Sequence, residues 1–334
     1  MNKNIAFRKN KDKRNYYLIC IFLFVLGLAF SYGLLVYNNP VPIDSPSFLP
    51  VIKRRKNALI AMGLAAICQA LGTVVFQTIT SNKIITPSLL GFEAIYSTIQ
   101  TSLMYFLGLR VFLKLDSIYF YLGQIILMVG VCLLLFYGIL NMENASIDLV
   151  LLVGVVMGQG LRSVSAFMRR ILSPSEFDVL QASLFASVNN AKEEYFLISS
   201  ILIGLVSVLI FLNTKKLNIL ALGKSFSENL GLNYKKETIR GLIAVSILMS
   251  ISTALVGPMT FFGFLVASLS YQIVKTYDHK YLLVLASLLA YLILTGAYFI
   301  MNHIFNANGV VSILIEMIGG ISFLILIFKD RNLW

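Results

Sequence analysis

The feature that most constrains this chain is a series of ten apolar stretches, each close to the length that a helix needs to cross a membrane. A spanning helix takes about 20 mainly apolar residues, and the stretches that qualify lie at 17–37, 57–79, 88–109, 118–140, 147–168, 195–213, 239–256, 258–275, 281–301 and 310–328. Of the 334 residues, 58% are hydrophobic and 13% are charged, whereas a soluble domain carries about 25% charged residues. We therefore predict an all-α, polytopic membrane bundle of about ten helices that forms a single transmembrane domain over 1–334.

Two of these assignments depend on the boundaries of the apolar stretches. The stretches 239–256 and 258–275 are separated only by Gly257 and Pro258, and we expect the proline to break the helix there. A single long helix would instead give nine spans and would place the C-terminus outside. At the other end of the chain, the apolar stretch 17–37 is too long for a signal-peptide core and lacks a small-residue cleavage site. We interpret it as a first membrane helix that is not removed.

The distribution of basic residues predicts the orientation in the membrane. The chain holds 27 Lys and Arg against 15 Asp and Glu, a formal charge of +12. With ten spans and the N-terminus inside, 17 of the 27 basic residues fall on the inner side. This bias follows the positive-inside tendency and predicts that both termini are cytoplasmic, including a basic tail at 1–16. In a membrane chain the excess charge reflects basic loops and indicates no nucleic-acid partner.

Motifs for catalysis, metal binding and ATP binding are missing from the sequence. The three cysteines lie within apolar stretches with no CxxC or Cys/His spacing, which indicates neither disulfides nor zinc. The two histidines, His279 and His303, belong to separate loops, and no GxxxxGK[ST] phosphate loop occurs. We predict a chain that is not an enzyme and that takes no metal or other cofactor.

Three charged residues fall within the apolar stretches. Glu93, Arg162 and Glu316 are costly in a bilayer, and an intramembrane charge marks a functional site by default. Glu93 is near the inner boundary, where it is either an interfacial acid or a functional one. Glu316 is nearer the middle of its span, and we expect it at a helix or subunit interface, in proton coupling, or buried in neutral form. Arg162 is expected to face a water-filled cavity.

The cytoplasmic loop 213–237 is unusually apolar. We expect Ser225 or Ser227 to cap a short helix there and Gly231 to end it. From the residues alone, this helix either lies on the membrane surface or inserts into a groove on a soluble partner.

Four blocks of the sequence, one of them in the loop 213–237, resemble the membrane subunits of iron–siderophore and cobalamin ABC importers, the FecCD-type permeases. Each block is small and apolar, but four blocks occur in the family's order across ten spans. They are Arg55–Gly91, Leu220–Leu232, Gly257–Val266 and Ile318–Phe323. Ala267, Ser268 and Tyr271, together with Glu316, resemble a subgroup associated with catecholate-type siderophores.

The resemblance implies a permease that translocates a ferric siderophore across the cell membrane by alternating access. Its implied partners are two cytoplasmic ATPases, an extracytoplasmic binding protein, a second permease subunit, either identical or different, and membrane lipid. The loop 213–237 would then be the segment that couples the permease to the ATPase. The residues carried over for this role are Leu220, Leu222, Gly223, Phe226, Leu230, Gly231 and Leu232.

The resemblance also implies an outer basic site for acidic residues of the binding protein. In the family, two arginines bracket a Leu-Pro pair before the second span. Here Arg55 matches the second arginine, whereas Ile52 stands at the position of the first. Docking is therefore predicted on the cluster Lys53, Arg54, Arg55 and Lys56.

For the translocation path we expect small and polar side chains along the axis of a permease dimer. The inner gate is predicted at Asn82 and at the loop residues Asn144, Ser146 and Asp148. The main alternative is a secondary transporter in which Glu93 or Glu316 relays protons or binds sodium. An intramembrane enzyme is a weaker alternative, because the sequence holds no catalytic set.

Overall fold

The computed structural model is all-helical in the part of the chain that it describes, which is residues 6–7, 9–37, 45–46, 48–115, 117–140, 147–303, 305 and 311–330. Two short 3-10 helices, η1 (Pro87–Leu90) and η2 (Val188–Asn190), lie among the α-helices. The α-helices are α1 (Asn10–Val36), α2 (Phe48–Ile79), α3 (Phe92–Phe112), α4 (Ile118–Leu140), α5 (Ile147–Ile171), α6 (Pro174–Leu184), α7 (Glu193–Leu212), α8 (Thr214–Leu220), α9 (Lys224–Asn229), α10 (Tyr234–Val256), α11 (Phe262–Ile273), α12 (His279–His303) and α13 (Val311–Asp330).

Each of the ten predicted spans coincides with a helix, namely α1 to α5, α7 and α10 to α13. Seven of these are long and apolar enough to cross a membrane on their own: α1, α2, α4, α5, α7, α10 and α12. Helix α11 has 12 residues, fewer than the predicted span 258–275. Helix α3 carries a kink at Gly108, whose φ is 72°. Helices α3 and α11 thus differ from regular spanning helices, because packing against other helices stabilises them and their length alone does not.

The start of α2 differs from the prediction. The helix begins at Phe48, nine residues before the predicted span, so the basic cluster lies within its first turns rather than in a loop. Hydropathy excludes Lys53–Lys56 from a span, but a charged side chain does not prevent backbone hydrogen bonding at a helix end that faces water. The outer cluster is therefore carried on a rigid helix.

The predicted break between the seventh and eighth spans is confirmed. Helix α10 ends at Val256, and Gly257 follows with φ 91° and ψ 176°, a conformation essentially restricted to glycine. The Val256 carbonyl accepts a hydrogen bond from the Ser187 amide at 2.7 Å. A loop between α6 and α7 therefore holds the end of α10, and α11 returns as a separate helix.

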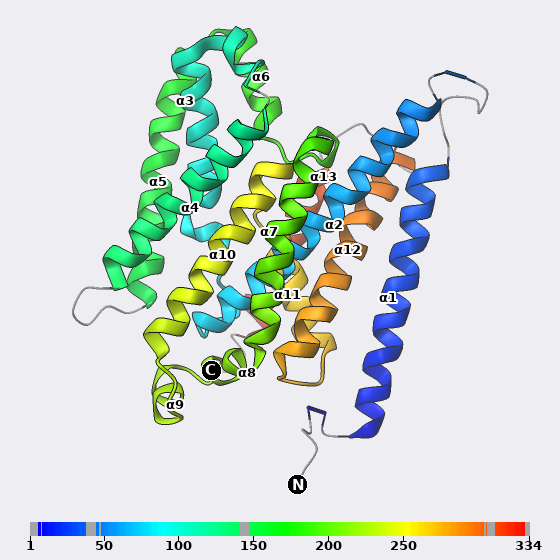
Figure 1. Ribbon diagram of the computed structural model, residues 1–334, viewed down its shortest axis with the longest axis vertical. Helices are drawn as coiled ribbons and strands as arrows, with labels where there is room; N and C mark the ends of the chain where they lie inside the picture. Colours follow the sequence, from blue (N-terminus) through cyan, green and yellow to red (C-terminus); the bar gives the residue numbers. More distant parts are fainter. Residues whose placement is uncertain are drawn as a thin grey trace.

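Helix α2 forms the centre of the bundle, between α10 and α12 (Figure 1). It is buried almost continuously from Ala61 to Ile79, and small residues along it permit close helix contact. The buried Gln69 amide donates to the Ser252 hydroxyl of α10 at 3.1 Å. Since α2 runs from the basic cluster at one end to the cytoplasmic loops at the other, it connects the two predicted partner sites.

The short helix η1 packs against the middle of α5. Leu90 and Gly91 pack on Gly154 and Gly158, and a Cβ added to Gly154 would be 3.2 Å from the Leu90 Cα. Gly158 is eleven residues into α5, about 16 Å along the helix at about 1.5 Å per residue. The glycines of α5 thus let the chain re-enter the bundle before α3 begins.

Helix α6 was not expected from the sequence, because it is short and only partly apolar. A capping box starts it: the Glu176 amide donates to the Ser173 hydroxyl at 3.4 Å, and the Ser173 amide donates to the Glu176 carboxylate at 3.0 Å. The Ser173 hydroxyl also donates to that carboxylate at 2.8 Å, and these hydrogen bonds lower the pKa of Glu176. Helix α6 lies at the upper end of the bundle in Figure 1.

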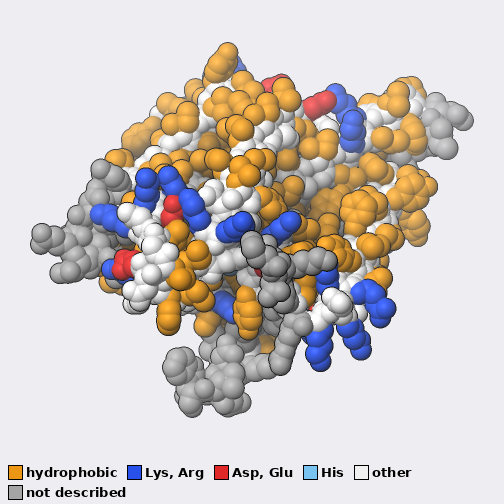
Figure 2. Space-filling model, turned by 60° about the horizontal axis from the view of Figure 1, so that its bottom comes forward, with side chains coloured by type: hydrophobic (Ala, Val, Ile, Leu, Met, Phe, Trp, Pro, Cys, Tyr) orange, Lys and Arg blue, Asp and Glu red, His pale blue; other side chains and the backbone are white. Residues whose placement is uncertain are grey.

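The loops predicted to lie on one side of the membrane are found at the same end of the bundle. Helices α8 and α9 and the start of α1 lie at the lower end in Figure 1, and α6 lies at the opposite end with the start of α2. Figure 2 brings the lower end forward and shows clusters of Lys and Arg on it, with few acidic side chains. By the positive-inside tendency, the lower end is the cytoplasmic side.

Candidate functional site

The loop predicted to couple the permease to its ATPase folds into two short helices, α8 and α9, joined by a turn at Ala221–Gly223. Gly223 has φ 89° and is the N-cap of α9, so the predicted caps, Ser225 and Ser227, are wrong. The Ser227 side chain is buried instead, and its hydroxyl lies within hydrogen-bond distance of the Ile219 and Gly223 carbonyls, at 3.0 and 2.7 Å. Ser227 therefore fastens the two helices together.

The predicted end of α9 at Gly231 is confirmed. Gly231 has φ 80°, and its amide donates to the Glu228 carbonyl at 2.9 Å. The Leu232 amide donates to the Ser227 carbonyl at 3.0 Å, which completes a Schellman motif. Both glycines of the segment thus occupy left-handed positions that fix its shape.

The apolar side chains of this segment divide into an exposed and a buried group. Leu222, Phe226 and Leu230 are 56%, 66% and 62% exposed, and they recur every four residues. Leu220 is 1% exposed and packs into the core, and Leu232 is half-buried against it. An exposed patch of three large apolar side chains is typical of a surface that contacts a protein partner or a membrane. We call Leu222, Phe226 and Leu230 the coupling knob.

A hydrogen-bonded chain through His279 joins α8 to the membrane helices. His279 Nδ1 lies 2.6 Å from the Asn218 side-chain oxygen, and His279 Nε2 lies 2.8 Å from the Thr78 hydroxyl. The Asn218 amide nitrogen donates to Asp278 at 3.1 Å. Asn218 belongs to α8, Thr78 to the end of α2 and His279 to the start of α12, so displacement of α8 would pull on both membrane helices.

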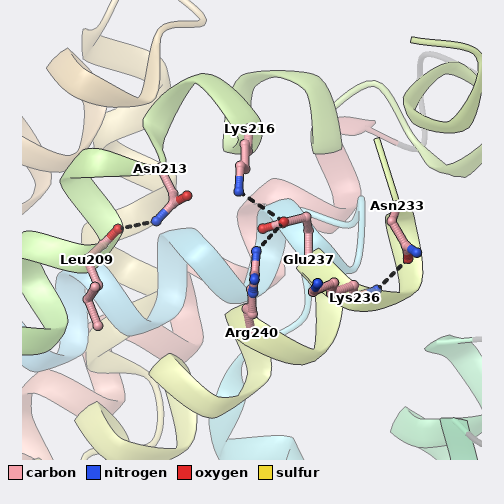
Figure 3. A network of polar contacts seen from close by, with 7 residues as sticks. All are labelled: Leu209, Asn213, Lys216, Asn233, Lys236, Glu237 and Arg240. Atoms are coloured by element: carbon pink, nitrogen blue, oxygen red, sulfur yellow. Dashed lines mark hydrogen bonds and ion pairs between the residues drawn. The ribbon is translucent and has the colours of Figure 1, made fainter. Parts of the chain in front are cut away.

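A second link ties α8 to α10 (Figure 3). Lys216 of α8 and Arg240 of α10 contact the same oxygen of Glu237, at 3.0 and 2.6 Å. The Asn233 side chain caps α10 by accepting from the Lys236 amide at 2.9 Å. The Tyr234 hydroxyl donates to the Ile79 carbonyl of α2 at 3.1 Å. Together the links brace the coupling knob against α2, α10 and α12.

The four residues of the outer basic cluster occupy different environments. Lys53 pairs with Glu193 of α7 at 2.8 Å. Arg55 is half-buried and donates to the Leu35 and Tyr37 carbonyls at the end of α1, both at 3.1 Å. Arg54 and Lys56 are exposed. Arg55 therefore holds α1 against α2, whereas the other three side chains lie on the outer surface.

Two clefts lie beside this cluster. One, of about 690 Å³, is bordered by Lys53, Arg54 and Glu194, and the other, of about 460 Å³, by Arg54, Arg55 and His303. The His303 ring stacks on Phe299, with centroids 4.7 Å apart. Arg54 is shared by both clefts, which makes it the central charge of the outer surface.

Of the predicted gate residues, only Asn82 lies fully within the described part of the chain. It is exposed after the end of α2, where its side-chain oxygen accepts from the Ile84 amide at 2.9 Å. Asn144 and Ser146 lie outside the described residues. Asp148 is in the first turn of α5, and its side chain also lies outside them.

The three intramembrane charges come together from three helices. Glu93 of α3, Arg162 of α5 and Glu316 of α13 lie close enough for their charges to influence one another, but no direct ion pair joins these three described residues. The Thr260 hydroxyl donates to the Glu93 carboxylate at 2.8 Å, and the Ser88 hydroxyl donates to the Thr260 carbonyl at 3.2 Å. Irregular backbone at membrane depth needs such internal partners. The cluster thus joins η1 to the segment between α10 and α11.

Helix α5 presents polar side chains on its outer face. Gln159, Arg162 and Ser163 are exposed beside large apolar side chains such as Val156 and Phe167. Exposed polar groups within a span are costly against lipid, which favours a second subunit or water opposite this face. Among the described residues, no group of three or more His, Cys, Asp or Glu is arranged to hold a metal ion.

The bracing residues Asn218, His279 and Thr78, and also Thr260, are not predicted as functional by any sequence motif. Each is an isolated polar residue next to or inside an apolar stretch, and no local pattern marks it. A polar residue within an apolar stretch was the only sign in the sequence that these side chains have a specific role.

An all-helical bundle, in which seven of the described helices are long and apolar enough to cross a membrane, is the architecture expected of a membrane transport protein. A family model, the FecCD transport family, matches residues 17–329. The chain therefore belongs to the FecCD transport family and is a multi-pass cell-membrane permease of the iron–siderophore importer type. This family membership confirms the resemblance and does not support the alternative of a proton- or sodium-coupled transporter.

Known relatives agree with this assignment. The petrobactin import system permease protein FatC of Bacillus anthracis is 54% identical over 98% of this chain and 93% of its own length. YclO, a petrobactin import system permease protein of Bacillus subtilis, is 33% identical over 95% of this chain and 97% of its own length. Bacillus anthracis also has a second such permease protein, FatD, which is 23% identical over 63% of this chain and 60% of its own length.

The fold also matches a solved structure. A putative metal-chelate type ABC transporter in an inward-facing conformation superposes with a TM-score of 0.78, at 19% identity, over 94% of this chain and 99% of that one. As a permease of this family, the chain works with ATPase subunits, a binding protein and a second permease, and it does not itself hydrolyse ATP.

Proposed function

We propose that this chain is the permease subunit through which ferric petrobactin enters the cell. The 54% identity to a petrobactin import permease, extending over 98% of this chain, carries the proposal. The absence of a metal-ligand group among the described residues is compatible with a substrate whose iron is already enclosed by its chelator. Affinity for the chelate then belongs to the binding protein, and the permease provides a path.

The second permease of the complex is proposed to be a different chain. In Bacillus anthracis, the petrobactin import system includes two permease proteins, and this chain is 54% identical to one and 23% identical to the other. The polar outer face of α5 and the Glu93–Arg162–Glu316 cluster are proposed to border the path opposite that second permease. The gate would be completed by Asn82, Asn144, Ser146 and Asp148.

Uptake of radioactive iron as ferric petrobactin tests the substrate. Cells that lack this chain are expected to lose this uptake and to regain it when the wild-type gene is restored. Uptake of iron as a trihydroxamate chelate serves as the control and should not change. Equal loss of both chelates, or of neither, would contradict the proposed substrate. Co-purification of the tagged chain with an untagged copy of itself, rather than with a second permease, would contradict the heterodimer.

The coupling knob is proposed to dock into a groove on the ATPase, with Leu220, Gly223, Gly231 and Leu232 fixing its shape. The exposure of Leu222, Phe226 and Leu230 supports this role, as does the bracing of α8 against three membrane helices. A rigid segment transmits a conformational change as a body, which suits a motor that acts from outside the membrane.

Docking of the binding protein is proposed to depend on Arg54 and Lys56, with Lys53 contributing through its exposed pair. We expect Arg54→Glu combined with Lys56→Glu to slow association of the binding protein about tenfold at low ionic strength, because opposite charges steer encounter. The difference should shrink at high salt, since screening weakens exposed charges. The measurement is the association rate with the permease in lipid nanodiscs.

Lys114→Glu is the matched control for this variant, because Lys114 is an exposed basic residue at the same end but outside the cluster. Arg55 is left unchanged, since its contacts with α1 make it structural. An association rate for the double variant equal to that of Lys114→Glu, at all salt concentrations, would remove the cluster from the docking site.

A further inference from the structure

A groove between α7 and α10 opens near the cytoplasmic end of the bundle. It has a volume of about 510 Å³, within the range of about 300–1,000 Å³ that is usual for ligand sites. Its walls are apolar side chains of both helices, such as Leu209, Ile243 and Ile247, and Val75 of α2 forms part of the floor. The groove therefore reaches down between the two helices to the central helix, where Val75 is 1% exposed.

The groove opens beside an apolar surface of α7. On α7, exposed apolar side chains, including Leu205, Val208 and Leu212, are 61%, 57% and 75% exposed. In Figure 1, α7 lies on the near face of the bundle. An apolar groove beside such a surface is filled by hydrocarbon when the chain is in a bilayer, because an empty void forfeits dispersion contacts.

The mouth of the groove carries the Lys216–Glu237–Arg240 network (Figure 3). Two cations share one carboxylate, which leaves one net positive charge. Their side chains are 39% and 53% exposed, whereas that of Glu237 is 11% exposed. A lysine has three hydrogen-bond donors and an arginine has five, so contact with Glu237 leaves donors available on the exposed side. The mouth lies where α7 ends and α10 begins, at the predicted inner surface of the membrane.

We propose that this groove binds an anionic phospholipid of the inner leaflet, with its phosphate at Lys216 and Arg240 and one acyl chain between α7 and α10. Basic groups at the cytoplasmic end of a pocket between membrane helices attract acidic headgroups. The apolar groove and the adjacent cations match the two parts of such a lipid. Since Lys216 belongs to α8, the lipid also stabilises the segment that carries the coupling knob.

The test measures lipid binding by the purified full-length chain in a neutral detergent, by native mass spectrometry with phosphatidylglycerol as the probe. We expect Lys216→Gln with Arg240→Gln to weaken binding about 30-fold, given the usual contribution of each basic residue near an anionic headgroup. Phosphatidylcholine should bind the wild type at least tenfold more weakly. Lys224→Gln with Lys235→Gln is the matched control, because both residues are exposed at the same end outside the groove, and it should leave affinity unchanged.

A second variant addresses the acyl chain without changing charge. Ala244 lines the groove and is half-buried, so Ala244→Phe fills it and should weaken phosphatidylglycerol binding about tenfold. The melting temperature of each variant in lipid-free detergent shows whether it remains folded. If the charge variant is unfolded, Ala244→Phe decides alone.

Three results would overturn the proposal. One is equal phosphatidylglycerol affinity for the wild type and for the folded variants. Another is displacement of the lipid by inorganic phosphate at equal affinity, which would reduce the site to an ion site. The third is unchanged lipid binding together with loss of the ATPase in the charge variant, which would assign Lys216 and Arg240 to the ATPase surface.

Discussion

Phe226→Asp is expected to abolish import of the siderophore while the permease stays folded in the membrane. Phe226 is 66% exposed at the centre of the coupling knob, so its replacement removes no core packing. In the proposed complex its ring is buried in the ATPase, where truncation of such an anchor costs at least about 2 kcal/mol. A buried unpaired carboxylate adds to that cost. Retention of the ATPase on the purified permease should fall at least about 30-fold, with uptake falling in parallel.

Tyr277→Asp provides the matched control for this experiment. Tyr277 is an aromatic residue, 92% exposed, in the loop between α11 and α12 on the same side of the molecule. It should leave retention of the ATPase unchanged if the knob is specific. Wild-type retention of the ATPase by Phe226→Asp would show that the knob is not the docking element. Equal losses in both variants would show that a negative charge anywhere on this end disturbs the complex.

Gly257→Ala is expected to cause a large loss of stability, because both the backbone conformation and the space at this position require glycine. The φ of 91° and ψ of 176° at this position strain any residue with a side chain, at a cost of about 1–3 kcal/mol. The added Cβ would also lie 2.8 Å from the Ala186 Cα, a backbone atom that cannot move independently. Overpacking of this kind adds about 1–3 kcal/mol. We expect the free energy of unfolding to fall by roughly 3 kcal/mol, measured by denaturation in detergent micelles.

Gly204→Ala distinguishes this local strain from a general effect of methyl addition in the membrane. Gly204 lies within α7, and a Cβ there would meet no atom within 4 Å. Its replacement should change stability by no more than about 1 kcal/mol, in the stabilising direction, because alanine favours a helix over glycine. Similar stability for both variants would show that the junction between α10 and α11 relaxes without penalty, contrary to the packing of Ala186 against it.

The predictable part of the fold follows from local hydropathy. Each of the ten predicted spans coincides with a helix, and the Gly257-Pro258 break correctly divides two of them, because a spanning helix must satisfy its backbone within one apolar stretch. The helix ends were predicted less well. Helix α2 extends through Lys53–Lys56 to Phe48, since hydropathy records where a helix leaves the apolar layer and not where its hydrogen bonding stops.

In the coupling segment, too, one feature could be predicted from the local sequence and another could not. Gly231 was correctly predicted to end α9, because the left-handed C-terminal position of a helix strongly selects glycine. The serine caps were wrong, because Ser227 is turned inward to the Ile219 carbonyl of α8. That contact exists only after α8 and α9 fold against each other, and no sequence pattern records it.

The sequence alone determined the ten apolar stretches that fold as helices, the predicted orientation of the chain in the membrane, and the family to which it belongs. These properties depend on composition and on motifs within short stretches. The tertiary structure decided which isolated polar residues act together. Glu93, Arg162 and Glu316 come from three helices, and the Asn218–His279–Thr78 chain comes from three more. Their proximity results from helix packing between segments as much as 223 positions apart, and the free energy of that packing is distributed over apolar contacts that hydropathy cannot pair.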